Sequence, residues 1–193
     1  DYDNLEYRRN ELYVNQGKNF EGIPLFKEEA FKYNLDLPNY STQATFFDYD
    51  RDGDLDMFLI NHGIDPADVE PNISKLLNNV SPYSSDRLYR NDNGKFKDVS
   101  KESGIINNAI GFGLGIAIGD LNNDGWPDIL VGHDYSEKDH LYLNQTDGTF
   151  KEAIKKTTNH ISNFSMGNDI GDINNDGLLD FISLDMVSNN NYD

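Results

Sequence analysis

The nine residues Asp120-Leu-Asn-Asn-Asp-Gly-Trp-Pro-Asp128 decide the fold of this chain, because their pattern occurs three times. The other copies read Asp48-Tyr-Asp-Arg-Asp-Gly-Asp-Leu-Asp56 and Asp172-Ile-Asn-Asn-Asp-Gly-Leu-Leu-Asp180. All three follow D-x-[DN]-x-D-G-x-x-D, with oxygen-bearing side chains at positions one, three, five and nine. Carboxylates at this density repel one another, and a hard divalent cation with about six to eight oxygen ligands would hold them together. The pattern therefore predicts three calcium sites.

Each predicted site draws its ligands from its own loop. Positions one, three, five and nine supply side-chain oxygens, position nine closes the site, and the backbone carbonyl of position seven completes the shell. Glycine at position six allows the turn that brings the later ligands onto the ion. The predicted ligands are Asp48, Asp50, Asp52, Asp54 and Asp56 in loop 1, Asp120, Asn122, Asp124, Trp126 and Asp128 in loop 2, and Asp172, Asn174, Asp176, Leu178 and Asp180 in loop 3.

Two alternatives explain part of this pattern. An EF-hand loop opens in the same way but needs glutamate at position twelve and flanking helices. Position twelve is Leu59, Val131 or Ser183, and short runs of β-forming residues follow the loops. A solvated hairpin turn would account for one Asp-Gly pair, but not for three in-phase copies that keep four oxygen positions. The loops are therefore predicted to connect β-strands.

A second motif repeats in register with the loops. Leu12-Tyr-Val-Asn15, Leu88-Tyr-Arg-Asn91 and Leu141-Tyr-Leu-Asn144 are each followed by a glycine-containing turn and a phenylalanine, which is typical of a hairpin. The repeat unit is thus four short strands, here called A to D. Strand A, such as Gly113-Leu-Gly-Ile-Ala-Ile-Gly119, enters the acidic loop and strand B leaves it. Strand C carries Leu-Tyr-x-Asn and strand D carries the phenylalanine.

Four-stranded sheets repeated around an axis are the plan of a β-propeller. We therefore predict that residues 1–193 form one all-β partial β-propeller, in which small residues place strand A innermost. A C–D strand pair is expected in 1–35, full blades in 43–99 and 111–154, and an A–B strand pair in 165–186. These are about three blade-equivalents, and because about four to eight blades close a ring, we expect further blades outside this sequence. Residues 62–86 form a long B–C insertion, which we interpret as a spacer, with a binding role as the alternative.

The composition excludes several partners. The chain has 34 acidic and 16 basic residues, for a net charge of −18, and a field of this sign repels nucleic acid and anionic membranes. Apolar runs are too short for direct membrane insertion, and cysteine is absent, which excludes disulfides and thiol chemistry. Calcium loops of low affinity suit millimolar calcium and thus favour an extracellular location.

Other motifs have simpler interpretations. Gly111-Phe-Gly-Leu-Gly115 leads into an acidic loop that would repel phosphate, so close backbone packing is expected instead of nucleotide binding. His62 and His133 each follow a strand B, which raises the alternative of a second metal or catalytic site on the face opposite the loops. Since the third repeat has no histidine there, we interpret both as surface residues. The sequence shows no nucleophile–base pair.

These residues resemble the FG-GAP/VCBS-type calcium-binding β-propeller repeats of integrin α-chain heads and bacterial surface proteins. The segment from Asp86-Arg-Leu-Tyr-Arg-Asn91 to Gly119-Asp-Leu-Asn-Asn-Asp-Gly-Trp-Pro-Asp-Ile129 is similar, more narrowly, to the ASPIC/UnbV-associated (cartilage acidic protein-like) group. The resemblance implies a seven-bladed, calcium-stabilised propeller at the cell surface. It also implies protein or glycan partners. The blades are too few and an ASPIC-like C-terminal segment is absent, so we expect a fragment of a bacterial surface protein, with a lipoprotein anchor among the options.

The predicted function is that of a non-enzymatic calcium-binding module for adhesion or assembly, alone or as a subunit of a larger surface complex. The alternative is a polysaccharide-acting enzyme domain or accessory. Its active site would lie on the face that carries His62, His133 and the insertion.

Overall fold

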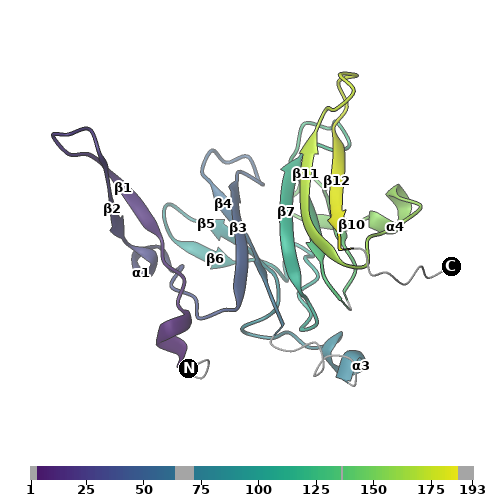
Figure 1. The fold of residues 1–193 in the computed structure, drawn as a ribbon, viewed down its shortest axis with the longest axis horizontal. Helices are drawn as coiled ribbons and strands as arrows, with labels where there is room; N and C mark the ends of the chain where they lie inside the picture. Colours follow the sequence, from purple (N-terminus) through teal and green to yellow (C-terminus); the bar gives the residue numbers. More distant parts are fainter. Residues whose placement is uncertain (1–3, 64–71, 136, 187–193) are drawn as a thin grey trace.

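The computed structural model describes residues 4–63, 72–135 and 137–186, and strands dominate it (Figure 1). The helical segments are each four residues long: η1 (Leu5–Arg8), α1 (Ala30–Tyr33), α3 (Ile73–Leu76) and α4 (Ile154–Thr157). None of the helices in the described ranges is long and apolar enough to cross a membrane. The predicted all-β class is confirmed.

Within the described ranges the strands form four separate antiparallel sheets. The first half of the chain contributes β1 (Tyr13–Lys18), β2 (Pro24–Glu28), β3 (Ser41–Phe47), β4 (Asp56–Asn61), β5 (Arg87–Asn91) and β6 (Phe96–Asp98). The second half contributes β7 (Gly113–Gly119), β8 (Asp128–His133), β9 (His140–Asn144), β10 (Phe150–Glu152), β11 (Ser165–Gly171) and β12 (Asp180–Asp185). Two sheets are four-stranded, β3-β4-β5-β6 and β7-β8-β9-β10, and two are strand pairs, β1-β2 and β11-β12.

The sheets stand side by side, with β3, β7 and β11 as neighbouring inner strands (Figure 1). Side chains link these strands: Thr42 Oγ1 donates to the carbonyl of Gly113 at 2.6 Å. A Cβ at Gly115 would lie 2.7 Å from Cα of Gly167, so the two backbones approach too closely for any side chain. The expected role of the Gly111–Gly115 run in close packing is confirmed, and the arrangement is that of a partial β-propeller.

Each second strand of a full sheet is buried on both faces. In β4, Phe58 and Ile60 face the core shared with the β7–β10 sheet, whereas Met57 and Leu59 face the core beside the β1–β2 pair. The same alternation in β8 divides its residues between two cores. Because a strand alternates its side chains between two faces, all six consecutive residues can be buried when each face packs against a core. Burial on both faces fixes the register of each strand, and with it the position of the acidic loop that precedes the strand.

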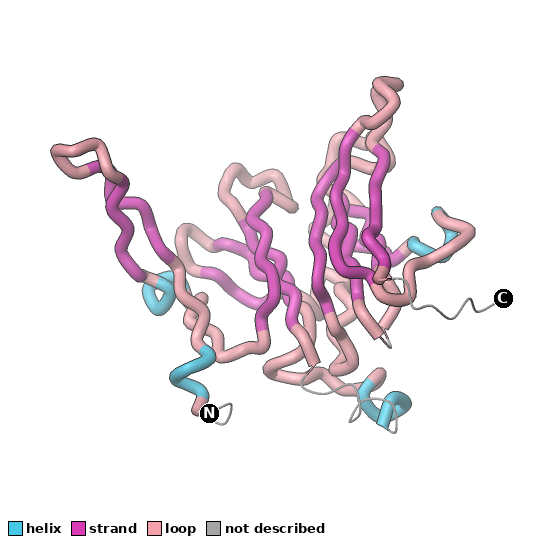
Figure 2. The backbone as a smooth tube through the Cα atoms, in the orientation of Figure 1, coloured by secondary structure: helices cyan, strands magenta, loops and turns pink. Residues whose placement is uncertain are grey.

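The three acidic loops lie at one end of the sheets, and α3 lies at the other (Figures 1 and 2). Helix α3 belongs to the predicted 62–86 insertion, and its Ile73 and Leu76 pack against Ile110 and Phe112. Residues 64–71 of this insertion lie outside the described residues. Helix α3 of the insertion is thus packed against the residues that lead into the β7–β10 sheet.

Candidate metal centre

The three loops share one backbone conformation, set by positions one and six. The carboxylate at position one accepts a hydrogen bond from the glycine N–H at position six, at 3.1, 2.7 and 2.9 Å in loops 1, 2 and 3. These glycines, Gly53, Gly125 and Gly177, have φ values of 96°, 88° and 86°. Such φ values strain any other residue, so the nine-residue pattern is sufficient to dictate the turn.

Position nine ties the end of each loop to its beginning. The Oδ2 atoms of Asp56, Asp128 and Asp180 accept hydrogen bonds from the N–H groups of Tyr49, Leu121 and Ile173, at 3.1, 2.9 and 3.1 Å. Each of these aspartates is also the first residue of a strand B. The loop is therefore closed at the point where the sheet begins.

In both full sheets the second oxygen of this aspartate is bonded to strand C. The N–H of Asn91 donates to Asp56 Oδ1 at 2.8 Å, and the N–H of Asn144 donates to Asp128 Oδ1 at 2.9 Å. These asparagines are the last residues of the Leu-Tyr-x-Asn motifs. Sequence reasoning placed both motifs in one repeat unit but assigned no contact between them. The separations differ, with 35 positions between Asp56 and Asn91 and 16 between Asp128 and Asn144, so spacing gave no signal that they meet.

Loop 1 brings three carboxylates together. Among the described residues, Asp48, Asp50 and Asp56 are the one set of three acidic or histidine side chains with ligand atoms all within 4.8 Å of one another. Loops 2 and 3 have Asn122 and Asn174 at position three, so their third oxygen is an amide oxygen. At position three, loop 1 therefore differs from loops 2 and 3 in the charge of the side chain, whereas all three loops keep an oxygen there.

The carboxylate at position five is hydrogen-bonded within its own loop. Asp52, Asp124 and Asp176 each accept a hydrogen bond from the N–H of position seven, at 3.0, 2.8 and 2.9 Å. A carboxylate has about four lone-pair sites, so this bond leaves oxygen capacity for a cation. The assignment of positions five and seven as ligands stays a prediction.

The donor set of loop 1 fits a hard cation. Asp48 Oδ1 and Asp54 Oδ1 are buried and have no hydrogen-bond partner in the described structure. Burial raises the pKa of Asp56 to about 7, although two backbone N–H groups lower it, and burial also raises the pKa values of Asp50 and Asp128. A cation at this position would compensate both the unpaired oxygens and the buried charge, so these oxygens suit a hard divalent cation.

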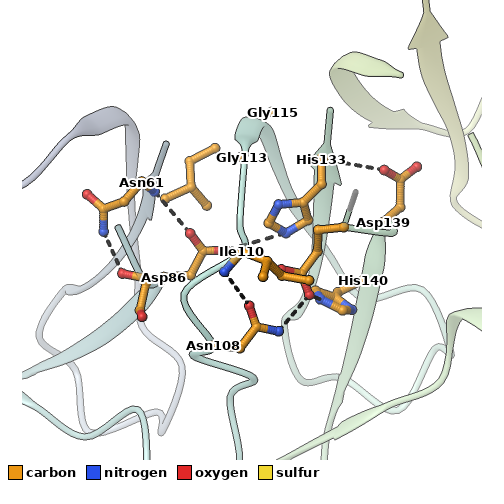
Figure 3. Close-up of polar contacts among 12 residues, drawn as sticks. Asn61, Asp86, Asn108, Ile110, Gly113, Gly115, His133, Asp139 and His140 are labelled. Atoms are coloured by element: carbon orange, nitrogen blue, oxygen red, sulfur yellow. Dashed lines mark hydrogen bonds and ion pairs between the residues drawn. The ribbon is translucent and has the colours of Figure 1, made fainter. Parts of the chain in front are cut away.

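At the opposite end, His133 is buried, so its interpretation as a surface residue is wrong. Only 1% of the residue is exposed, and burial lowers the pKa of its imidazole to about 3. Figure 3 shows the ring turned toward Asp86, which precedes β5 of the neighbouring sheet. Nε2 of His133 and Oδ2 of Asp86 are 3.4 Å apart, longer than a charge-assisted hydrogen bond. His133 thus packs between two sheets.

A second polar pair lies beside His133. His140 Nε2 and Glu137 Oε1 are 3.0 Å apart, and Asn108 Nδ2 donates to the same carboxylate at 2.9 Å (Figure 3). The sequence had given no motif around His140. His62, the other expected surface histidine, is half-buried and packs edge-on against Phe112.

Sheets of four antiparallel strands around closely packed inner strands, with acidic loops at one end, define a repeat protein of the β-propeller class. The FG-GAP-like repeat matches residues 77–131 and 120–183, which together span more than half of the chain, and the chain belongs to this family. Integrin alpha-3 of Mus musculus and integrin alpha-3 of Cricetulus griseus are each 38% identical to it over 80 residues. Each alignment covers 36% of this chain and 8% of the integrin, so the chain spans a small part of these relatives.

Proposed function

We propose that this chain is a non-enzymatic calcium-binding β-propeller module that mediates adhesion or assembly outside the cell. The observation that carries the proposal is the link between loop and sheet. In both full sheets, the aspartate that closes the acidic loop also accepts a hydrogen bond from strand C. An ion bound by the loop would therefore hold three strands of a blade together.

The proposed sites use the ligands named from the sequence, one calcium ion for each loop. When bound, calcium neutralises the converging carboxylates. The protein's part is to hold the oxygens in place through the N–H groups of positions two, five, six and seven. At a calcium concentration ten times the dissociation constant, each site would add about 1.4 kcal/mol to the free energy of unfolding. This role is structural, since protein oxygens fill the coordination shell.

The location and partners follow from the relatives and the charge. Two integrin alpha chains are among the proteins that this chain resembles, which supports an extracellular or cell-surface location and a protein partner. A glycan partner, membership of the ASPIC/UnbV-associated group and a bacterial source remain part of the proposal on the residues quoted above. The net charge of −18 disfavours nucleic acid and anionic membranes as partners.

Thermal unfolding with and without calcium tests the metal role. The chain should melt at a higher temperature in millimolar calcium than in EDTA, and elemental analysis of protein dialysed in calcium should find bound calcium. Asp124→Ala should remove one equivalent from calorimetric titrations, and Asn123→Gly serves as the control, because Asn123 is not a predicted ligand and glycine tolerates its φ of 59°. Equal melting temperatures in both buffers, together with no bound calcium, would sink the proposal.

Glycan arrays followed by turnover assays test the non-enzymatic part. Binding without release of reducing ends or unsaturated products is expected if a glycan is the partner. Turnover that is lost on substitution of His62, on the face proposed for the alternative active site, would instead favour a polysaccharide-acting enzyme.

A further inference from the structure

Arg51 reaches from loop 1 to loop 2. It occupies position four of loop 1, and its Cζ lies 5.0 Å from the centroid of the Trp126 ring at position seven of loop 2. Its Nη1 and Nη2 atoms lie 3.8 and 3.9 Å from the point where a Cβ on Gly125 would stand. The guanidinium thus covers both the indole and the adjoining turn of loop 2, in the geometry of a cation–π contact.

The backbone at Arg51 does not suit an arginine. Its φ is 60°, and the equivalent residues of loops 2 and 3, Asn123 and Asn175, both have φ of 59°. Asparagine tolerates this left-handed conformation better than residues with long side chains do. A disfavoured residue in such a position points to a role that the surrounding contacts maintain. The contact that distinguishes Arg51 from the two asparagines is the one with Trp126.

We propose that Arg51 couples calcium binding in loop 1 to calcium binding in loop 2. The proposal rests on the proposed calcium function. Residues at positions three and five, Asp50 and Asp52, flank Arg51, and the carbonyl of Trp126 is the predicted position-seven ligand of loop 2. An ion in loop 1 would fix the backbone on both sides of Arg51. The guanidinium would then hold Trp126 and its carbonyl in place before loop 2 binds its own ion.

The expected coupling is positive and reciprocal. An exposed cation–π contact corresponds to a change in affinity of about two- to fivefold. By linkage, an ion in loop 2 must strengthen binding in loop 1 by the same factor. Loops 2 and 3 offer an internal comparison. Asn123 at position four of loop 2 corresponds to Arg51, and Leu178 at position seven of loop 3 corresponds to Trp126. These two residues cannot form a cation–π contact.

Simple electrostatics predicts the opposite sign. A guanidinium near loop 2 repels a calcium ion, so removing its charge should tighten binding in loop 2. Coupling through the indole contact predicts weaker binding in loop 2 when Arg51 is replaced. The direction of the shift therefore separates the two effects.

Trp126 is the single tryptophan of the chain, so its fluorescence reports on loop 2. Calcium would be titrated into the 193-residue chain, with calorimetry in parallel, for six proteins: wild type, Asp48→Asn, Asp172→Asn, Arg51→Asn, Arg51→Lys and the double variant Asp48→Asn/Arg51→Asn. Arg51→Asn keeps every predicted ligand and gives loop 1 the residue found in the other two loops. Arg51→Lys keeps the charge but loses the planar group. Circular dichroism confirms that each variant is folded.

The midpoint of the Trp126 signal should rise about two- to fivefold in Asp48→Asn and Arg51→Asn, rise by less in Arg51→Lys, which keeps a cation for the indole, and stay unchanged in Asp172→Asn. Adding Arg51→Asn to Asp48→Asn should give no further shift, because both remove the same coupling. A lower or unchanged midpoint in Arg51→Asn, or an equal rise in Asp172→Asn, overturns the coupling. Absence of calcium binding by calorimetry in the wild type overturns the proposed function instead.

Discussion

The full β7–β10 sheet and the β11–β12 pair contain the same acidic loop in different surroundings. The position-one to position-six hydrogen bond is 2.7 Å in loop 2 and 2.9 Å in loop 3. Yet all six residues of β8 are buried, whereas the residues of β12 are half-buried or exposed. Loop conformation is therefore a local property of nine residues. The burial of the strand that follows depends on whether a third strand pairs with it.

Strand C makes the difference. In the full sheet β9 pairs with β8, and Asn144 bonds the loop-closing Asp128. In the described residues Asp180 accepts a hydrogen bond from Ile173 alone, and β12 pairs only with β11. The β1–β2 pair shows the complementary case, since it carries the Leu-Tyr-x-Asn motif but lacks an A–B partner in its own sheet. A residue in a full four-stranded sheet should therefore contribute more to the free energy of unfolding than the equivalent residue in a strand pair.

The largest contrast is expected between Leu130 in β8 and Ile182 in β12, which hold equivalent positions. Leu130 is 0% exposed and Ile182 is 57% exposed. Leu130→Ala should reduce the free energy of unfolding by about 2–5 kcal/mol, because it leaves a cavity in a packed core. Ile182→Ala should cost less than about 1 kcal/mol. Urea unfolding of the 193-residue chain measures both, and equal losses would contradict the comparison.

A smaller contrast is expected between Asn144 and Asn15, the last residues of two Leu-Tyr-x-Asn motifs. Asn144 is buried, and its Nδ2 donates to the carbonyl of Tyr49 at 2.9 Å. Asn144→Ala would leave that carbonyl without this donor, at a cost of about 1–3 kcal/mol. Asn15 is exposed, and among the described residues its side chain accepts only from the nearby Gly17 N–H. Asn15→Ala should therefore stay within about 0.5 kcal/mol of wild type in the same urea experiment.

The glycines at position six of loops 2 and 3 should lose nearly the same free energy of unfolding when each is replaced by alanine. Gly125 and Gly177 have φ of 88° and 86°, and a Cβ would meet nothing closer than 3.8 Å at either position. Replacement by alanine should cost about 1 kcal/mol in both loops, because the strain belongs to the backbone and not to the surroundings. Thermal unfolding of Gly125→Ala and Gly177→Ala checks this. A clearly larger loss at Gly125 would show that the sheet, too, constrains the loop.

Much of the fold could be predicted because its signals are local and repeated. The Asp-Gly pattern predicted strand–loop–strand units, and the glycines of Gly113–Gly119 predicted the tight inner packing that the Gly115–Gly167 approach confirms. The burial of His133 could not be predicted, because it depends on Asp86 of a neighbouring sheet 47 positions away in the sequence. The contact between Arg51 and Trp126 was missed for the same reason, since it joins two loops that lie far apart in the sequence.

The sequence by itself determined the turn of each loop and the strands on either side of it. Those features rest on positive-φ glycines, on hydrogen bonds within nine residues and on the alternation of apolar side chains. Only the tertiary structure decided which loop-closing aspartates are bonded to strand C, which histidines are buried and which arginine touches the next loop. These contacts depend on how neighbouring sheets pack, and no local preference encodes a distance between side chains of different sheets.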